Sequence, residues 1–201
     1  MTTLLLVRHG ETDWNAARRI QGSSDIPLND TGRAQARETA AALVEQYATE
    51  HPLVVSSDLA RAAETAQIIA DALGVDGPRT YLELRERAYG EAEGMTDTEV
   101  IARYGGWVHA DIPGAEDSPQ LRARALSGVR RVVRDARRLH APRDVPVIAV
   151  AHGGVIAELI RHASGGELPL PGERLANASI HTFRVERDRI SVLSYAAIPV
   201  A

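Results

Sequence analysis

Two stretches of the chain end an apolar run in residues that could do chemistry. In LLLVRHG, Arg8 and His9 follow four apolar residues, and in VIAVAHGG, His152 follows a second apolar run. A further cation, Arg61, comes shortly after the apolar segment of HPLVVSS. Two arginines and two histidines at one place would form a cationic pocket, and arginine forks match phosphate oxygens in geometry as well as charge. The residues therefore suggest a phosphate-binding pocket.

The hydrophobic pattern predicts the elements that carry these residues. Residues 3–7, 54–55 and 145–151 form continuous apolar runs, which are typical of strands covered on both faces in parallel sheets. Helical stretches alternate with them, and the alternating segments 178–186 and 188–196 predict a hairpin. We therefore expect a three-layer, doubly wound α/β fold: a mostly parallel sheet with helices on both faces and a C-terminal β-hairpin at the edge.

Helix boundaries follow from capping residues. We expect helices to begin at Thr31-Gly32, at Asp58 and at Ser118, where Pro119 would occupy the first helical position. The helix after Asp58 should end at Gly74, and a further helix should follow the glycines after His152.

In such a fold the polar strand endings meet at one edge of the sheet. Ligands bind there, where the carboxyl ends of the strands face the starts of helices. With Asp58 as N-cap, Arg61 lies in the first helical turn and leans back toward the strand ends. Neighbours on a strand point to opposite faces, so Arg8 and His9 can serve one ligand only if the chain leaves the strand there. We expect Gly10 to permit the unusual backbone that this requires.

Each of these residues also has an ordinary structural interpretation. Arg61 alone could be a solvated helix residue, His9 a satisfied strand-end histidine, and His152 a helix cap. Histidine is also a common metal ligand, but the flanking arginines would repel a cation, so we expect no metal site. We expect the remaining histidines to be structural or exposed: His51, His109, His140, His162 and His181.

Composition narrows the class of protein. A chain of 201 residues suits one α/β domain, and the absence of cysteine excludes disulfides and thiolate chemistry. A net charge of -4 argues against nucleic acid as a partner. No apolar run approaches the roughly 20 residues of a membrane span, and MTTLLLV lacks the basic start of a signal peptide. We expect a cytoplasmic protein without membrane contact, and the sequence leaves open whether it is a monomer or a homodimer.

The opening motif LLLVRHGETDWN resembles the signature of the histidine phosphatase superfamily, in its phosphoglycerate mutase-like branch. The resemblance continues in the family's order and covers most of residues 3–160. Its sibling acid phosphatase branch expects an arginine and a proline soon after RHG, and the residues that follow here do not match it. The further matching motifs are RRIQGSSDIPLNDTGRAQA, SSDLARAAETA, LRERAYGEAEG and VAHGG.

The resemblance implies a role for each motif residue. His9 would be the nucleophile that becomes a phosphohistidine. The phosphate would be held by a set of polar and glycine residues, namely Arg8, Asn15, Gln21, Gly22, Arg61, His152 and Gly153. Four carboxylates could supply the general acid and base: Glu83, Glu86, Glu91 and Glu93. Motif register selects Glu86, and we expect Glu83 and Glu91 to be solvated charges. The resemblance implies no metal ion and no cofactor, because fixed cations stabilise the transferring group.

The family contains hydrolases and mutases, so the nucleophile alone does not decide the reaction. Its mutases resemble one another in an Asn after the second His-Gly, where this chain has Gly154, and in a basic cluster that binds the substrate carboxylate. Residues 95–117 of this chain hold Arg103 as their one arginine or lysine, and we expect them to form a lid or wall over the leaving group. Two aromatic residues of this segment, Tyr104 and Trp107, could belong to that wall or could simply pack against the body of the protein.

We therefore expect residues 1–201 to be a single phosphatase domain acting on a small phosphorylated metabolite. A phosphoglycerate mutase and a non-catalytic phosphate-binding module remain the alternatives.

Overall fold

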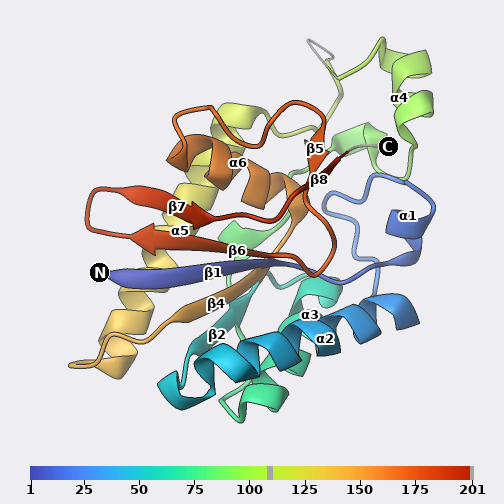
Figure 1. Ribbon diagram of the computed structural model, residues 1–201. Helices are drawn as coiled ribbons and strands as arrows, with labels where there is room; N and C mark the ends of the chain where they lie inside the picture. The colour runs from blue at the N-terminus through green and yellow to red at the C-terminus, as the bar shows by residue number, and fades with distance from the viewer. Residues whose placement is uncertain (108–110, 200–201) are drawn as a thin grey trace.

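A six-stranded sheet forms the centre of the protein (Figure 1). The structure is a computed structural model that describes residues 1–107 and 111–199. The strand order is β3-β2-β4-β1-β6-β7. The first four strands run parallel to one another, β6 pairs antiparallel with β1, and β7 pairs antiparallel with β6. The strands are β1 (Thr2–Arg8), β2 (Leu53–Ser56), β3 (Arg79–Thr80), β4 (Val147–Ala151), β6 (Ile180–Val185) and β7 (Ile190–Ser194). A separate antiparallel pair consists of β5 (Glu173–Arg174) and β8 (Ile198–Pro199).

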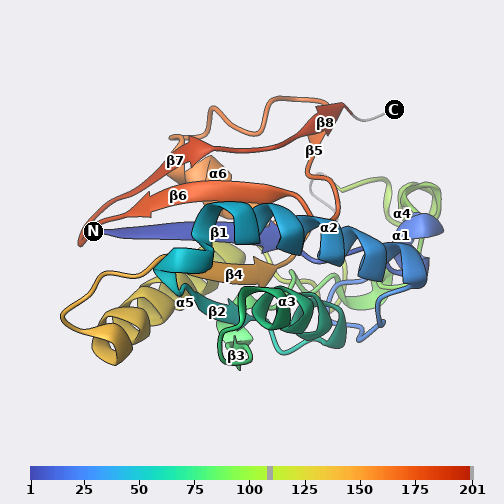
Figure 2. The same ribbon diagram turned by 60° about the horizontal axis from the view of Figure 1, so that its bottom comes forward.

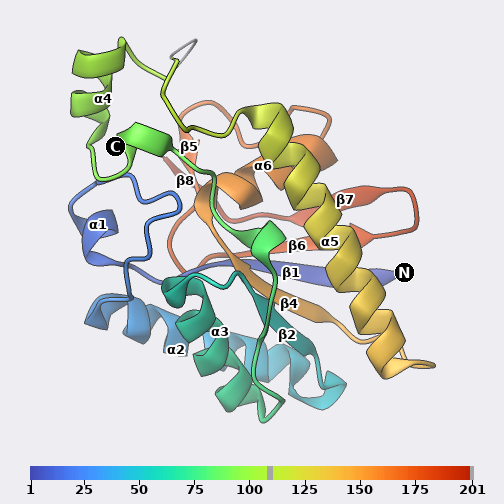
Figure 3. The same ribbon diagram turned by 180° about the vertical axis from the view of Figure 1, so that it is seen from behind.

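Helices cover both faces of the sheet (Figures 2 and 3). One face carries α2 (Asp30–Tyr47) and α3 (Ala60–Leu73), and the other carries α5 (Ser118–His140) and α6 (Gly153–Ala163). The shorter helices are α1 (Asp13–Ala16), η1 (Ala48–Glu50), η2 (Leu82–Leu84), η3 (Gly90–Ala92) and α4 (Asp97–Tyr104). The predicted three-layer α/β fold is confirmed, and so is the C-terminal hairpin, because β6 and β7 form one edge of the sheet.

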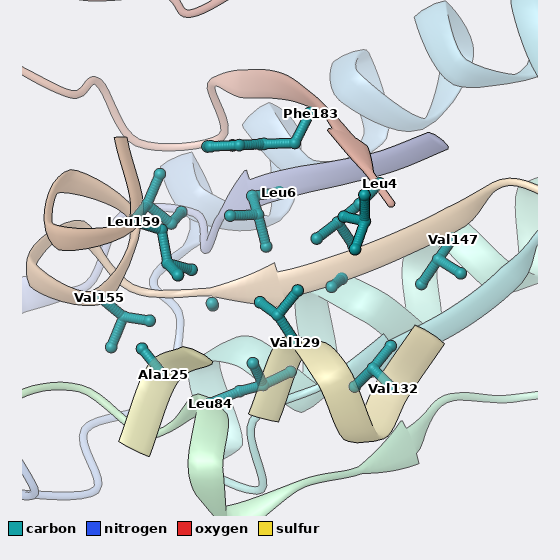
Figure 4. Close-up of a cluster of buried hydrophobic side chains, with 14 of the residues drawn as sticks. Leu4, Leu6, Leu84, Ala125, Val129, Val132, Val147, Val155, Leu159 and Phe183 are labelled. Carbon is teal, nitrogen blue, oxygen red and sulfur yellow. The ribbon is translucent and has the colours of Figure 1, made fainter. Parts of the chain in front are cut away.

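The continuous apolar runs reflect burial on both faces of the central strands. Along β1, Leu4 and Leu6 enter the cluster beneath α5 and α6 (Figure 4), whereas Leu5 and Val7 enter the cluster beneath α2 and α3. Each such leucine or valine contributes roughly 1.5–3 kcal/mol by leaving water. The two clusters therefore fix the position and direction of β1 between the helix layers. They thereby also fix the position of the residues at the end of the strand.

Two helix caps differ from the sequence prediction. Asp58 is not the N-cap of α3: Leu59 holds that position without a side-chain cap, and the Asp25 carboxylate accepts from the Ala60 amide at 2.7 Å. Asp58 instead pairs with Arg85. The N-cap of α5 is Asp117, not Ser118.

The geometry of α5 shows why Asp117 takes the cap. Its carboxylate accepts from the Gln120 amide at 2.7 Å, and the Gln120 side chain accepts from the Asp117 amide at 3.1 Å. This reciprocal pair makes Asp117 the better cap, because it satisfies donors on both sides of the first turn.

Gly10 is required for space rather than for an unusual backbone. Its φ is not in the left-handed region. A Cβ on Gly10 would collide with the carbonyl of Gly32 in the first turn of α2, and a Cβ on Gly32 would collide with the carbonyl of Glu11. The loop after β1 therefore lies directly against the start of α2.

Within the described ranges, no helix combines the length and apolar character needed to cross a membrane.

This close approach predicts that Gly32→Ala destabilises the protein, although alanine is the better helix former by up to about 1 kcal/mol. The new Cβ meets backbone, which cannot move aside cheaply, so we expect a loss of about 1–3 kcal/mol in the free energy of unfolding. Urea denaturation measures it. Ala41→Gly, on the exposed side of α2, calibrates the propensity effect alone. An unchanged or stabilised Gly32→Ala protein would contradict the proposed packing.

Candidate active site

The carboxyl edge of the sheet brings together the four cationic or titratable residues that the sequence singles out. Arg8 ends β1, His9 follows it, and His152 lies between β4 and α6. Arg61 occupies the first turn of α3 and directs its Nε to His9 Nε2 at 3.3 Å. The rings of His9 and His152 have centroids 5.1 Å apart. Three segments far apart in the chain therefore converge on one point.

Hydrogen bonding determines the tautomer of His9. Its Nδ1 lies 2.7 Å from the carbonyl oxygen of Gly10. A carbonyl only accepts, so we assign the proton to Nδ1, which leaves a lone pair on Nε2. Burial, followed by the charges of Arg8 and Arg61, lowers the pKa of His9 well below its usual 6.5. The ring is therefore a neutral base whose free nitrogen faces Arg61.

Backbone carbonyls orient the two arginines. Arg61 is fully buried, and its terminal nitrogens donate to the carbonyls of Ser24 at 2.8 Å and Gly22 at 2.9 Å. Arg8 donates to the carbonyl of Leu175. Burial lowers the pKa of both arginines, while the carboxylate of Glu86 opposes that shift. Both guanidinium groups keep their charge, since arginine is not deprotonated in proteins.

Several buried polar atoms at this point have no partner within the protein. They are Arg8 Nε, both ring nitrogens of His152, and Gln21 Oε1. Buried polar groups are nearly always hydrogen-bonded, so unpartnered donors and acceptors gathered in one place indicate a site for a ligand. Burial, and then the neighbouring His9, lowers the pKa of His152 well below 6.5. The neutral ring still carries one N–H donor, and together with Arg8 Nε it suits an anion.

A cavity of about 390 Å³ opens onto these groups. Seven of the sequence-predicted site residues line it, namely Arg8, His9, Asn15, Gln21, Gly22, Arg61 and Glu86. His152 and Gly153 are not in the lining: His152 is fully buried beside His9, and a Cβ on Gly153 would lie 3.4 Å from Arg8 Nε. The Oδ1 of Asn15 accepts from Asn177 at 3.1 Å, which leaves the amide nitrogen of Asn15 to face the cavity.

Glu86 is the one of the four candidate carboxylates that lines this cavity. Its Oε2 accepts from the Gly154 amide at 3.0 Å, and its Oε1 accepts from the Arg87 amide at 2.8 Å. The other three carboxylates have partners elsewhere. Glu83 pairs with Arg131, Glu91 pairs with Arg103, and Glu93 accepts from the amides of Ser23 and Ser24. Glu91 is a solvated charge as expected, because its side chain is 50% exposed despite the ion pair, whereas the paired side chain of Glu83 is only 23% exposed.

A family model described as histidine phosphatase superfamily (branch 1) matches residues 4–198. The chain belongs to the histidine phosphatase superfamily. It is 37% identical over 196 residues to the uncharacterized phosphatase PhoE of Bacillus subtilis (strain 168), covering 97% of this chain and 94% of that protein. It is 36% identical over 191 residues to phosphoglycerate mutase-like protein 4 of Arabidopsis thaliana, covering 90% of this chain and 79% of that one.

A solved structure agrees with this assignment. The mycobacterial glucosyl-3-phosphoglycerate phosphatase in complex with VO3 has a TM-score of 0.81 and 30% identity, and the match covers 98% of this chain and 100% of that one. Together with the phosphatase relatives, this makes the chain a phosphatase of the histidine phosphatase superfamily.

The outer part of the phosphatase cavity contains residues that the sequence reasoning missed. Beyond the predicted site residues, it is lined by Arg19, Ile20, Arg87 and Tyr89, and by Asp97 and Trp107 of the expected lid segment 95–117. Arg87 and Tyr89 flank Glu86 in LRERAYG, a signal that could have indicated them. Arg19 has no such signal, because only its tertiary pairing with Thr96 places it there.

Of the two aromatic residues expected in the lid, only Trp107 lines the cavity. It donates to Asp97 at 3.1 Å, and its ring centroid lies 5.6 Å from that of Tyr89. Tyr104 instead donates to Glu91 at 3.1 Å. Residues 108–110 of the expected lid lie outside the described residues.

No group of three or more His, Asp or Glu side chains arranged to hold a metal ion occurs in residues 1–107 and 111–199. Of the other described histidines, His181 is buried and accepts from the Ala196 amide at 3.2 Å, which fits a structural role. His109 lies outside the described residues.

The lowered pKa values of His9 and His152 predict that both imidazoles are neutral at pH 6 in the folded, ligand-free enzyme. Histidines of the unfolded chain are then mostly protonated. The unfolded state therefore binds more protons, so the stability these groups confer is complete above pH 6.5 and is lost as the pH falls. The loss reaches at most about 1.4 kcal/mol per pH unit for each group.

Nitrogen chemical shifts of the histidines, together with unfolding free energies between pH 7.5 and 5, test this prediction. A His9→Gln variant should show a shallower pH dependence of stability than the wild type. Imidazolium signals for His9 and His152 at pH 6 in the folded protein would contradict it.

Proposed function

We propose that this phosphatase hydrolyses phosphate monoesters of small metabolites through a phosphohistidine on His9, without a metal ion. One observation carries the proposal: the unprotonated Nε2 of a neutral His9, which accepts from Arg61 Nε at 3.3 Å, lies beside the unpartnered buried nitrogens of Arg8 and His152. This arrangement supplies a nucleophile and an oxyanion site at the same point.

In the first step, the lone pair of His9 Nε2 attacks the phosphorus atom. The N–P bond forms as the bond to the leaving oxygen breaks, and Glu86, acting as the general acid, transfers a proton to that oxygen. Arg8, Arg61 and His152 stabilise the charge on the three equatorial oxygens, and Asn15 and Gln21 assist from the cavity wall. Donors fixed before the reaction cost no reorganisation in the transition state.

In the second step, the carboxylate of Glu86 takes a proton from water as the water oxygen attacks phosphorus. The N–P bond breaks, its electron pair returns to Nε2, and inorganic phosphate leaves. A positioned acid or base of this kind typically contributes about 10²–10⁴-fold. The Gly10 carbonyl keeps the proton on Nδ1, so the same nitrogen serves as nucleophile in each cycle.

We also propose that residues 1–201 form a single domain in which residues 95–117 wall the leaving-group side. Asp97 and Trp107 from this segment line the cavity, and a volume of about 390 Å³ suits a small metabolite. Similar proteins include a phosphatase named for glucosyl-3-phosphoglycerate, and a phosphorylated sugar or organic acid is the corresponding class here. The absence of cysteine supports a cytoplasmic location.

The test of the proposed function is a phosphate-release panel of metabolite monoesters in EDTA, with His9→Ala as control. We expect turnover in EDTA, its loss in His9→Ala, and an acid-labile, base-stable phosphoenzyme trapped during turnover of the wild type. Loss of activity in EDTA would contradict the metal-independent mechanism, and absence of any turnover would favour a binding module. Phosphoglycerate interconversion exceeding phosphate release, followed by ³¹P NMR, would favour a mutase.

Gly154 gives a second prediction. A Cβ at this position would lie 2.5 Å from Glu86 Oε1 and 3.3 Å from the Tyr89 hydroxyl. Because the tip of Glu86 can swing away, Gly154→Ala should leave the unfolding midpoint unchanged. Activity should fall, since a misplacement of about 1 Å costs on the order of 10²-fold.

The matched control is Gly77→Ala, where the new Cβ would lie 3.1 Å from the Gln67 side chain and far from the cavity. Steady-state kcat/KM on the best substrate of the panel measures both variants. A Gly154→Ala enzyme as active as Gly77→Ala would refute the placement of Glu86.

A further inference from the structure

Glu86 follows a short turn in which only the first carbonyl, that of Leu82, accepts from a backbone amide of the described part of the chain, that of Arg85 at 3.1 Å. The turn is η2, a 3-10 helix of three residues, and the last carbonyls of any helix need an external donor. Arg124 of α5 supplies it. Its Nη1 donates to the carbonyls of Glu83 at 3.0 Å and Arg85 at 2.8 Å, and its Nη2 donates to the carbonyl of Glu86 at 3.2 Å.

The guanidinium is itself aligned by a carboxylate. Glu116 accepts from Arg124 Nε at 2.8 Å and from Nη2 at 2.6 Å, and the two side chains are 15% and 25% exposed respectively. Such a two-point pair fixes the plane of the guanidinium as well as its position. The Arg124 guanidinium therefore pairs with Glu116 through Nε and Nη2, and it donates to the backbone around Glu86 through Nη1 and Nη2.

The backbone of Glu116 holds the chain on the far side of Glu86. Its amide donates to the carbonyl of Ala88 at 2.8 Å, and its carbonyl accepts from Arg87 Nε at 2.8 Å. The residues immediately before and after Glu86 are therefore both tied to the Arg124–Glu116 pair. Because the pair is largely buried, these bonds compete less with water than surface ion pairs do.

The hydrophobic core fixes the helix that carries Arg124. Leu84, two residues before Glu86, lies among Ala125 and Val129 of α5 (Figure 4), and it is 1% exposed. Arg124 precedes Ala125 in that helix. The same packing that fixes α5 on the sheet therefore fixes the guanidinium, and through it the backbone of the carboxylate.

We propose that Arg124 is a positioning residue that holds Glu86 in reach of the leaving oxygen. The proposal rests on the assignment of Glu86 as general acid under the proposed function. The tip of Glu86 is held from the opposite side by the Gly154 amide of α6 at 3.0 Å. With its backbone fixed by α5 and its carboxylate by α6, Glu86 is set between two helices that pack on the same face of the sheet.

Leaving-group dependence tests this role. In Arg124→Lys, one ammonium replaces the fork and cannot serve three carbonyls and Glu116 together. kcat/KM reports phosphohistidine formation, the step in which Glu86 gives its proton. With glycerol 2-phosphate, whose alkoxide needs that proton, we expect a loss of roughly 10–100-fold. With 2,4-dinitrophenyl phosphate, whose leaving group needs no proton, the change should be less than about threefold.

The matched control is Arg131→Lys. Arg131 lies on the same helix and pairs with the Glu83 side chain at 2.7 Å, without a bond to the backbone of Glu86. It should show no dependence on the leaving group. Glu116→Gln leaves Arg124 in place but weakens its alignment, so it should show the same pattern as Arg124→Lys to a smaller degree. It also provides the test if Arg124→Lys does not fold.

The two proposals fail in distinguishable ways. If Glu86→Gln shows no leaving-group dependence, the general-acid assignment is wrong, and the role of Arg124 falls with it. If Glu86→Gln shows the dependence while Arg124→Lys and Glu116→Gln lose activity equally on both substrates, or lose none, Arg124 is only structural and the present inference alone is overturned.

Discussion

The structure depends on the cost of burying positive charge at one edge of a sheet. Arg61 is fully removed from water, Arg8 has a buried Nε without a partner, and two buried imidazoles lie beside them. Burying charged groups is unfavourable unless hydrogen bonds or opposite charges compensate them. Here the compensation is incomplete, and this favours the binding of an anion. Backbone carbonyls of Gly22, Ser24 and Leu175 offset part of the cost and orient the guanidinium groups. The same neighbourhood keeps His9 neutral, as its proposed role of nucleophile requires.

The rest of the fold supplies the rigidity that this arrangement needs. Two hydrophobic clusters, one on each face of the sheet, fix β1 and β4, whose ends carry His9 and His152. The close approach of Gly10 and Gly32 fixes the loop after β1. Glu86 is the exception, since it lies on an irregular segment. Its position depends on hydrogen bonds to α5 and α6 rather than on a strand, so distant substitutions should affect the carboxylate more readily than the phosphate pocket.

The sequence predicted local features well where one physical effect dominates. Continuous apolar runs indicated strands buried on both faces, and Gly74 indicated the end of α3, where it adopts φ 65°. Predictions failed where two neighbouring residues compete for one role. Asp117 and Ser118 are both good caps, and the side chain of Gln120 decides between them. Asp58 is a good cap by type, but its ion pair with Arg85 removes it from that role. The two-residue strands β3, β5 and β8 are too short to show a pattern.

By itself, the sequence determined the fold class, the edge of the sheet at which the candidate site lies, and the arginines and histidines that gather there. These follow from hydrophobic periodicity and from motifs that span only a few residues. Only the tertiary structure decided that Glu86 lies in the same cavity as His9 and Arg61, and that Arg19 joins Asp97 and Trp107 in the outer wall of that cavity. Those features depend on contacts between segments distant in the chain, whose register no local pattern encodes.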